Sequence, residues 1–178
     1  MIVFLTGFMG SGKSRIGREI SQKRGWKFID TDKEIEKRSH MSVMEIFSKK
    51  GELYFRSLEE KIIKEIGEVN IDCVVALGGG ALISDRSLKI VLKKGCLIYI
   101  QSNAEAIYQR VQHTSKRPLL QNDNTNWDKD TFLVKINDLL KIREPGYAQA
   151  HLTIQRDDLE AEDVADQIIS FLDKQHQC

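Results

Sequence analysis

The sequence predicts an α/β protein whose central parallel sheet of five strands carries helices on both faces. Two observations support this fold class. Short apolar, β-prone runs alternate with amphipathic segments of helical period along the 178 residues, which is the pattern of repeated βαβ units. Glycine-rich or acidic clusters follow the first three of these runs. Polar groups that end parallel strands meet at one edge of the sheet, where ligands bind.

The composition is that of one globular domain. Apolar residues make up 41% and charged residues 30% of the chain, and 27 basic against 26 acidic residues leave a net charge of +1. This balance indicates neither a nucleic-acid nor a membrane partner. No stretch approaches the roughly eighteen apolar residues of a membrane span, and the first residues lack a basic signal segment. We therefore expect a cytoplasmic protein and, because no extra interaction segment is visible, a monomer.

The cysteines add no covalent or metal framework. Cys73, Cys96 and Cys178 are far apart and have neither C-x-x-C nor His-Cys ligand spacing. Disulfides and zinc are therefore not expected.

The first strand is expected over residues 2–6, directly before the octet Gly7-Phe8-Met9-Gly10-Ser11-Gly12-Lys13-Ser14. The octet fits the phosphate-binding P-loop pattern at every fixed position. Its glycines let successive backbone N–H groups face phosphate oxygens, and the helix expected from about Lys13 adds its positive dipole end. Lys13 can reach the β- and γ-phosphates, and the Ser14 hydroxyl can ligate Mg²⁺. Nucleotide binding is thus predicted for Gly10, Ser11, Gly12, Lys13, Ser14 and the adjoining Arg15.

The second strand, over residues 26–29, ends at Asp30-Thr31-Asp32. Asp30 is expected to hold Mg²⁺ through water, while Asp32 hydrogen-bonds an acceptor hydroxyl or takes its proton. The alternative is a solvated turn in which Asp32 caps a helix. Residues 41–66 then show helical periodicity, with Ser42 as the N-cap and Gly51 dividing two helices.

The third strand, over residues 73–77, closes on Gly78-Gly79-Gly80. Three residues without side chains favour backbone N–H groups that face a substrate, against a merely flexible turn. This strand does not end in the aspartate of many nucleotide-binding strands, so the metal carboxylate is expected from strand two. The remaining expectations are a helix from about Asp85, a strand over 96–100, helices over 104–111 and 132–140, a strand over 151–154 and a closing helix over 164–172.

Residues 113–127 lose periodicity and predict a polar loop or lid. Within it Arg117 precedes Pro118, and lid closure can place a guanidinium on the phosphates. Spacing alone does not separate Arg56 or Arg143 from ordinary surface arginines.

Taken together, these motifs resemble the shikimate kinase family, small P-loop enzymes that phosphorylate the 3-hydroxyl of shikimate in aromatic amino-acid biosynthesis. The resemblance spans nearly the whole chain. It rests on the octet, Asp30-Thr31-Asp32, Phe55-Arg56 with Glu59, Gly78-Gly79-Gly80, Arg117-Pro118-Leu119-Leu120, and Arg143 four residues before Tyr147.

The resemblance implies a three-layer α/β/α P-loop fold like that of nucleoside monophosphate kinases. It implies one kinase domain over 1–178, with a substrate-binding helical segment at about 31–62 and a lid at about 112–127. ATP and shikimate are the implied substrates and Mg²⁺, held by Ser14 and Asp30, the implied cofactor. The implied catalytic residues are Lys13, Asp32 and Arg117. The implied shikimate contacts are Asp32, Arg56, Gly78, Gly79, Gly80 and Arg143, in which the two arginines grip the carboxylate. The implied ATP contacts beyond the octet are Arg110 along the adenine, Arg117 and Arg156.

Two segments depart from the family pattern. His113-Thr114-Ser115-Lys116 stands where many relatives carry an Arg-Asp pair, and Gln155-Arg156-Asp157-Asp158 lacks an expected proline. Two other functions are alternatives. A gluconate kinase would also need arginines for a carboxylate, but the complete motif set favours shikimate. A nucleotide-switched binding protein predicts an Asn-Lys-x-Asp tetrapeptide, which does not occur in the sequence.

Overall fold

The computed structural model describes residues 1–111 and 128–175. Its five-stranded sheet has the order β2-β3-β1-β4-β5, and every neighbouring pair is parallel. The strands are β1 (Ile2–Thr6), β2 (Lys27–Asp30), β3 (Cys73–Ala76), β4 (Cys96–Gln101) and β5 (Leu152–Gln155). The helices are α1 (Lys13–Arg24), α2 (Thr31–Ser39), α3 (Val43–Lys50), α4 (Glu52–Gly67), η1 (Ala81–Ile83), α5 (Asp85–Lys94), α6 (Ala104–Val111), α7 (Lys129–Tyr147) and α8 (Ala161–Gln175). The predicted fold class is confirmed.

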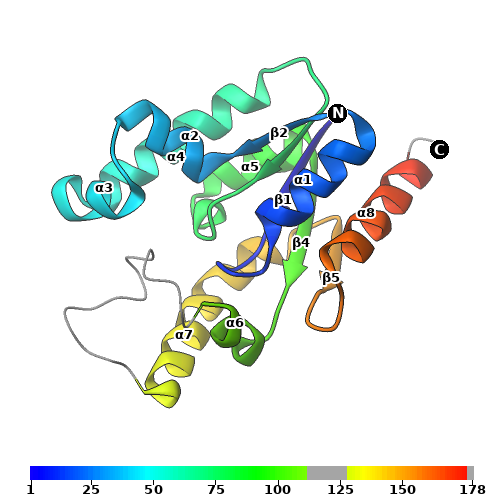
Figure 1. The fold of residues 1–178 in the computed structure, drawn as a ribbon. Coiled ribbons are helices and arrows are strands. Elements are labelled where there is room, and N and C mark those ends of the chain that lie inside the picture. Colours follow the sequence, from blue (N-terminus) through cyan, green and yellow to red (C-terminus); the bar gives the residue numbers. More distant parts are fainter. Residues whose placement is uncertain (112–127, 176–178) are drawn as a thin grey trace.

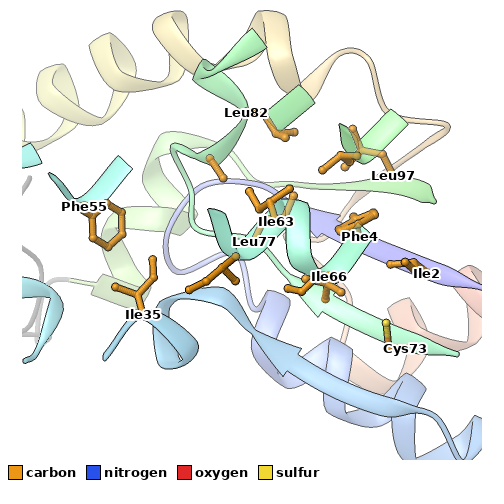
Figure 2. Close-up of a cluster of buried hydrophobic side chains, with 14 of the residues drawn as sticks. Ile2, Phe4, Ile35, Phe55, Ile63, Ile66, Cys73, Leu77, Leu82 and Leu97 are labelled. Carbon is orange, nitrogen blue, oxygen red and sulfur yellow. The ribbon is translucent and has the colours of Figure 1, made fainter. Parts of the chain in front are cut away.

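Helices cover both faces of the sheet. Successive strand residues point to opposite faces, so each face carries apolar side chains that a helix layer buries. Val3 and Leu5 of β1 pack with α1 and α8, which lie side by side in Figure 1. Ile2 and Phe4 point to the other face, against α4 and α5. Figure 2 shows this second layer, which runs from Ile2 at one end to Phe55 at the other. The inner strands β1 and β3 are buried throughout because the centre of the sheet is covered on both faces. The outer strands β2 and β5 are partly exposed and carry polar residues.

Local signals set several helix ends. Ser42 accepts a hydrogen bond from the Glu45 N–H, and the Glu45 side chain accepts one from the Ser42 N–H. This capping box starts α3 as predicted. Gly51 has φ 83° and separates α3 from α4, a conformation that glycine adopts without strain.

Helix α7 is longer than its apolar pattern predicted. It continues beyond 140 through Pro145 to Tyr147, although proline removes a helical hydrogen-bond donor. Packing explains the extension, because Arg143, Gly146 and Tyr147 in its last turns are all buried. A Cβ on Gly146 would lie 2.8 Å from the Leu82 carbonyl oxygen of η1. The end of α7 is therefore held against the segment that follows β3.

A third apolar cluster joins the P-loop to α6 and α7. Phe8 and Met9 of the loop pack with Ile107, Val111 and Ile136. Cys73 and Cys96 begin β3 and β4 and are free thiols, whereas Cys178 lies outside the described residues. Among the described helices, none has both the length and the apolarity needed to cross a membrane.

Candidate active site

A cavity of about 540 Å³ lies at the carboxyl ends of β1, β2 and β3. One end is formed by the P-loop and the other by the triple glycine with Arg56 and Arg143. Phe55 and Leu77, two residues of the apolar layer labelled in Figure 2, form part of its apolar wall. Predicted site residues that line this cavity are Gly10, Gly12, Lys13, Ser14, Arg15, Asp30, Asp32, Arg56, Gly78, Gly79, Gly80, Arg110 and Arg143.

The P-loop has the backbone that its glycines predict. Gly7, Gly10 and Gly12 have φ values of 142°, 79° and 91°, which L side chains rarely adopt. No side chain caps α1, which begins directly after Gly12. Its first N–H groups and its dipole therefore suit an anion. Lys13 is 8% exposed, and its Nζ donates to the carbonyl oxygens of Gly7 at 2.7 Å and Phe8 at 2.9 Å.

Ser14 and Asp30 bring two oxygen donors together beside the P-loop. The Ser14 hydroxyl donates to Asp30 Oδ2 at 2.7 Å. The other Asp30 oxygen accepts from the Lys33 N–H at 3.3 Å and caps α2. Asp30, and not Asp32, is therefore the helix cap, because it is the last extended residue before the helix. Asp32 lies in the first turn and lines the cavity.

The triple glycine makes room for charged side chains. A Cβ on Gly78 would lie 2.4 Å from Glu59 Oε1 and 2.9 Å from Asp32 Oδ1. On Gly79 it would lie 3.1 Å from Arg143 Nη1, and on Gly80 2.5 Å from Arg56 Nη2. The Gly78 N–H donates to Thr31 Oγ1 at 2.9 Å. That N–H is therefore used inside the protein, contrary to the expectation that it faces a ligand, and the glycines are needed for close approach.

Arg56 is held by two acidic residues of its own helix. Its Nη1 donates to Glu59 Oε2 at 2.7 Å, and its Nε and Nη2 donate to Glu52 Oε1 at 3.2 and 3.1 Å. Glu59 is 2% exposed, and its Oε1 has no hydrogen-bond partner among the described residues. Burial raises the pKa of Glu59 to about 7, against the lowering effect of Arg56. Asp32 also raises it, which indicates that the two carboxyl groups are electrostatic neighbours.

Arg143 is a buried cation with open hydrogen-bonding groups. It is 3% exposed, and its Nε and Nη1 have no hydrogen-bond partner in the described part of the chain. Its guanidinium lies over the Phe8 ring, with Cζ 4.9 Å from the ring centroid. A buried guanidinium with unfilled donors is costly unless a partner arrives. An anion at this end of the cavity would supply one.

Two further predicted arginines, Arg110 and Arg156, lie away from the triple glycine. Arg110 donates to Ser102 Oγ at 3.0 Å and lies 3.8 Å from Asp157 Oδ1. Arg156 packs over the P-loop, where a Cβ on Gly12 would lie 2.8 Å from its Cζ. Burial and the charges of Arg110 and Arg15 lower the pKa of Arg156. Arg156 and the buried Ser11 do not line the cavity.

Two parts of the prediction cannot be compared with the geometry, because Arg117 and the lid at 112–127 lie outside the described residues. The sequence interpretation assigned no role to Glu59, Phe8 or Tyr147, which contact the predicted arginines. The available signals were spacings. Glu59 follows Arg56 by three residues and Tyr147 follows Arg143 by four, and such pairs share a helix face.

The fold and the phosphate-binding loop, opening onto an arginine-lined second compartment, define a P-loop kinase of the small-molecule class. The family model described as shikimate kinase matches residues 9–173. The chain belongs to the shikimate kinase family. It is accordingly an ATP-dependent phosphotransferase of aromatic amino-acid biosynthesis.

Relatives and solved structures agree with this assignment. The chain is 42% identical over 157 residues to the shikimate kinase of Chlorobaculum tepidum, covering 88% of this chain and 82% of that protein. It is 40% identical over 172 residues to that of Histophilus somni, covering 96% and 94%. The structure of shikimate kinase from Acinetobacter baumannii in complex with shikimate has a TM-score of 0.89 and 33% identity, covering 98% and 93%. Family membership decides against a gluconate kinase or a nucleotide-switched binding protein.

Proposed function

We propose that this chain transfers the γ-phosphoryl group of ATP to the 3-hydroxyl of shikimate. The observation that carries the proposal is the unfilled Arg143 guanidinium beside Gly79, in one cavity with Lys13. Arg143 and Arg56 approach neighbouring glycines of one turn. Two guanidiniums so placed suit a carboxylate, which accepts paired hydrogen bonds.

The P-loop end would take the nucleotide. Lys13 exchanges its contacts with the loop carbonyls for phosphate oxygens, while the N–H groups of Gly10, Ser11 and Gly12 and the start of α1 surround them. Arg15, Arg110 and Arg156 form the basic group for the rest of the nucleotide, with Arg110 along the adenine.

The oxygen donors beside the P-loop fit a magnesium ion. Ser14 Oγ and Asp30 Oδ2 are 2.7 Å apart and are the hard ligands that Mg²⁺ prefers. When bound, the ion would neutralise charge on the phosphate oxygens. Ser14 would ligate it directly and Asp30 through water.

Asp32 would orient the acceptor hydroxyl. It lines the cavity next to the triple glycine, and phosphoryl transfer depends mainly on positioning and charge neutralisation. Asp32 accepts the hydroxyl hydrogen bond and, late in the reaction, the proton. The segment at about 31–62 forms the acceptor side. Arg117, in the proposed lid at about 112–127 and outside the described residues, would supply a further positive charge to the phosphates.

Enzyme assays and product analysis test this proposal. ADP release is measured with shikimate and gluconate as acceptors, and the product is identified by the coupling of phosphorus to the C3 proton. Arg143→Ala is compared with Lys141→Ala, an exposed residue of the same helix. We expect turnover with shikimate and none with gluconate, and a product that carries the phosphate at the 3-position. The KM for shikimate should rise in Arg143→Ala and stay at the wild-type value in Lys141→Ala. An unchanged KM in that variant would refute the carboxylate role.

The proposal includes a single-chain, cytoplasmic enzyme. The described residues that line the cavity include both the P-loop and the two arginines proposed to bind the acceptor. Sedimentation at micromolar concentration should give the mass of one chain, about 20.4 kDa.

A further inference from the structure

Tyr147 joins two parts of the acceptor end through one hydroxyl group. It is the last residue of α7 and is 1% exposed. Its hydroxyl donates to the carbonyl oxygen of Gly79, the residue whose missing Cβ leaves room for Arg143 Nη1. The ring is held by Tyr99, with the two ring centroids 4.8 Å apart. A buried, well-packed ring leaves this hydroxyl little freedom.

The Tyr147 hydroxyl has a single proton, and this decides whether it can donate to Arg143 or only accept from it. A phenol has one proton to donate, and here it is directed at the Gly79 carbonyl. Its oxygen can therefore only accept from any second partner. The guanidinium of Arg143 lies beside the same glycine, because a Cβ on Gly79 would lie 3.1 Å from Arg143 Nη1. Burial raises the pKa of Tyr147 to about 12, against the lowering effect of the positive charge of Arg143. A guanidinium only donates, so the two groups match.

The backbone around Tyr147 supports the same connection. Gly146 lets α7 approach η1 closely, since a Cβ there would lie 2.8 Å from the Leu82 carbonyl oxygen. The segment η1 directly follows Gly80. The end of α7 and the glycine turn are thus in contact at neighbouring points, at Gly146 and at the Tyr147 hydroxyl.

We propose that Tyr147 is a positioning residue for the acceptor carboxylate. Its hydroxyl holds the Gly79 turn and the Arg143 guanidinium in one arrangement, so that the free donors of Arg143 face the cavity before the acceptor arrives. This inference rests on the proposed carboxylate role of Arg143. Tyr147 acts through Arg143 and does not touch the reacting atoms. Preorganisation of this kind affects acceptor binding rather than the transfer step.

Tyr147→Phe removes the hydroxyl and keeps the ring, and Tyr99→Phe is the matched control. The Tyr99 hydroxyl donates to Glu144 of the same helix at 3.2 Å, whereas the Tyr147 hydroxyl donates to Gly79. We expect Tyr147→Phe to raise the KM for shikimate about tenfold, with kcat and the KM for ATP within about twofold of wild type. Tyr99→Phe should stay within about twofold for all three. Equal effects of the two variants, or a loss confined to kcat, would overturn the inference.

A neutral acceptor separates positioning from a general loss of structure. The methyl ester of shikimate has no carboxylate charge, so its KM should be the same in wild type and Tyr147→Phe. The kcat/KM for shikimate divided by the kcat/KM for the ester should then be about tenfold lower in Tyr147→Phe than in wild type. A variant that is merely less stable would weaken both acceptors alike, and that result would contradict the proposal.

Arg143→Ala, alone and combined with Tyr147→Phe, distinguishes the two proposals. If Arg143→Ala raises the KM for shikimate and Tyr147→Phe does not, the Tyr147 inference fails and the carboxylate role stands. If Arg143→Ala leaves the KM unchanged, the carboxylate role itself fails. Because Tyr147 acts through Arg143, Tyr147→Phe should have little further effect in the Arg143→Ala background. Additive effects would show independent action and refute the inference.

Discussion

The guanidinium of Arg143 lies over the ring of Phe8, with Cζ 4.9 Å from the ring centroid. Phe8 is an unspecified position of the P-loop pattern, whereas Arg143 belongs to the acceptor end of the cavity. The contact thus joins the P-loop to an arginine that we propose binds the acceptor. A cation over an aromatic face gains about 0.5 to 1 kcal/mol at exposed sites and about 2 kcal/mol when it is desolvated, and both groups are buried here.

Phe8→Leu should weaken acceptor binding, because it removes the aromatic face and keeps an apolar side chain. We expect the KM for shikimate to rise about 3- to 30-fold at saturating ATP. Steady-state kinetics with shikimate varied provide the measurement. Phe132→Leu is the control, since Phe132 packs with Tyr108 in the same apolar cluster. A KM that stays at the wild-type value in Phe8→Leu would contradict a role for this contact.

Lys13→Ala should chiefly impair phosphoryl transfer. Lys13 is the buried cation of the P-loop. It would stabilise the negative charge that develops on the phosphoryl group during transfer. We expect kcat to fall about 100- to 1,000-fold, measured by ADP release at saturating substrates. Lys23→Ala is the control, because Lys23 pairs with Glu162 and Asp166 on the surface. Comparable kcat values in the two variants would argue against this role of Lys13.

Gly78→Ala should damage the site by crowding. The new methyl group would lie 2.4 Å from Glu59 Oε1 and 2.9 Å from Asp32 Oδ1, so both carboxyl groups must move. Overpacking costs about 1 to 3 kcal/mol. We expect kcat/KM for shikimate to fall about 10- to 100-fold.

Gly67→Ala is the matched control for that substitution. Its methyl group would lie 3.1 Å from Ile90 Cγ2 and 3.2 Å from Lys94 Cγ, a looser contact than that at Gly78, and alanine favours a helix. Gly67→Ala should keep wild-type activity. Normal kinetics in Gly78→Ala would mean that this turn tolerates a side chain.

The pH dependence of stability should contain a contribution from Glu59. Its pKa is about 7 in the folded protein, against the 4.5 of a glutamate exposed to water in the unfolded chain. Between these values the folded chain holds a proton that the unfolded chain releases. Stability from this group is therefore complete below pH 4.5 and is lost as the pH rises through about 7. The ceiling is about 3 kcal/mol.

Urea unfolding at a series of pH values measures this contribution. Glu59→Gln cannot ionise, so its free energy of unfolding should fall less between pH 5 and pH 7.5 than that of wild type, by up to about 2.4 kcal/mol. Parallel pH profiles for the two proteins would contradict the raised pKa.

Much of the fold could be predicted because its signals are local. Apolar runs gave the strands within one or two residues, and Ser42 with Glu45 marked the start of α3. The end of α7 could not be predicted in this way. Pro145 argues locally against a helix, and only packing of Arg143, Gly146 and Tyr147 sustains the last turns.

By itself, the sequence predicted the P-loop, whose backbone conformation the structure shows at Gly7, Gly10 and Gly12. The groups from Gly7 to Ser14 are consecutive, and their function depends on backbone conformations that glycine allows locally. The tertiary structure decided how the residues proposed to bind the acceptor are brought together. Arg56, Gly79 and Arg143 come from α4, the turn after β3, and α7, and no local pattern distinguishes a buried arginine from a solvated one. Only the folded chain shows that Arg143 is buried against Phe8, because burial depends on segments that are distant in sequence.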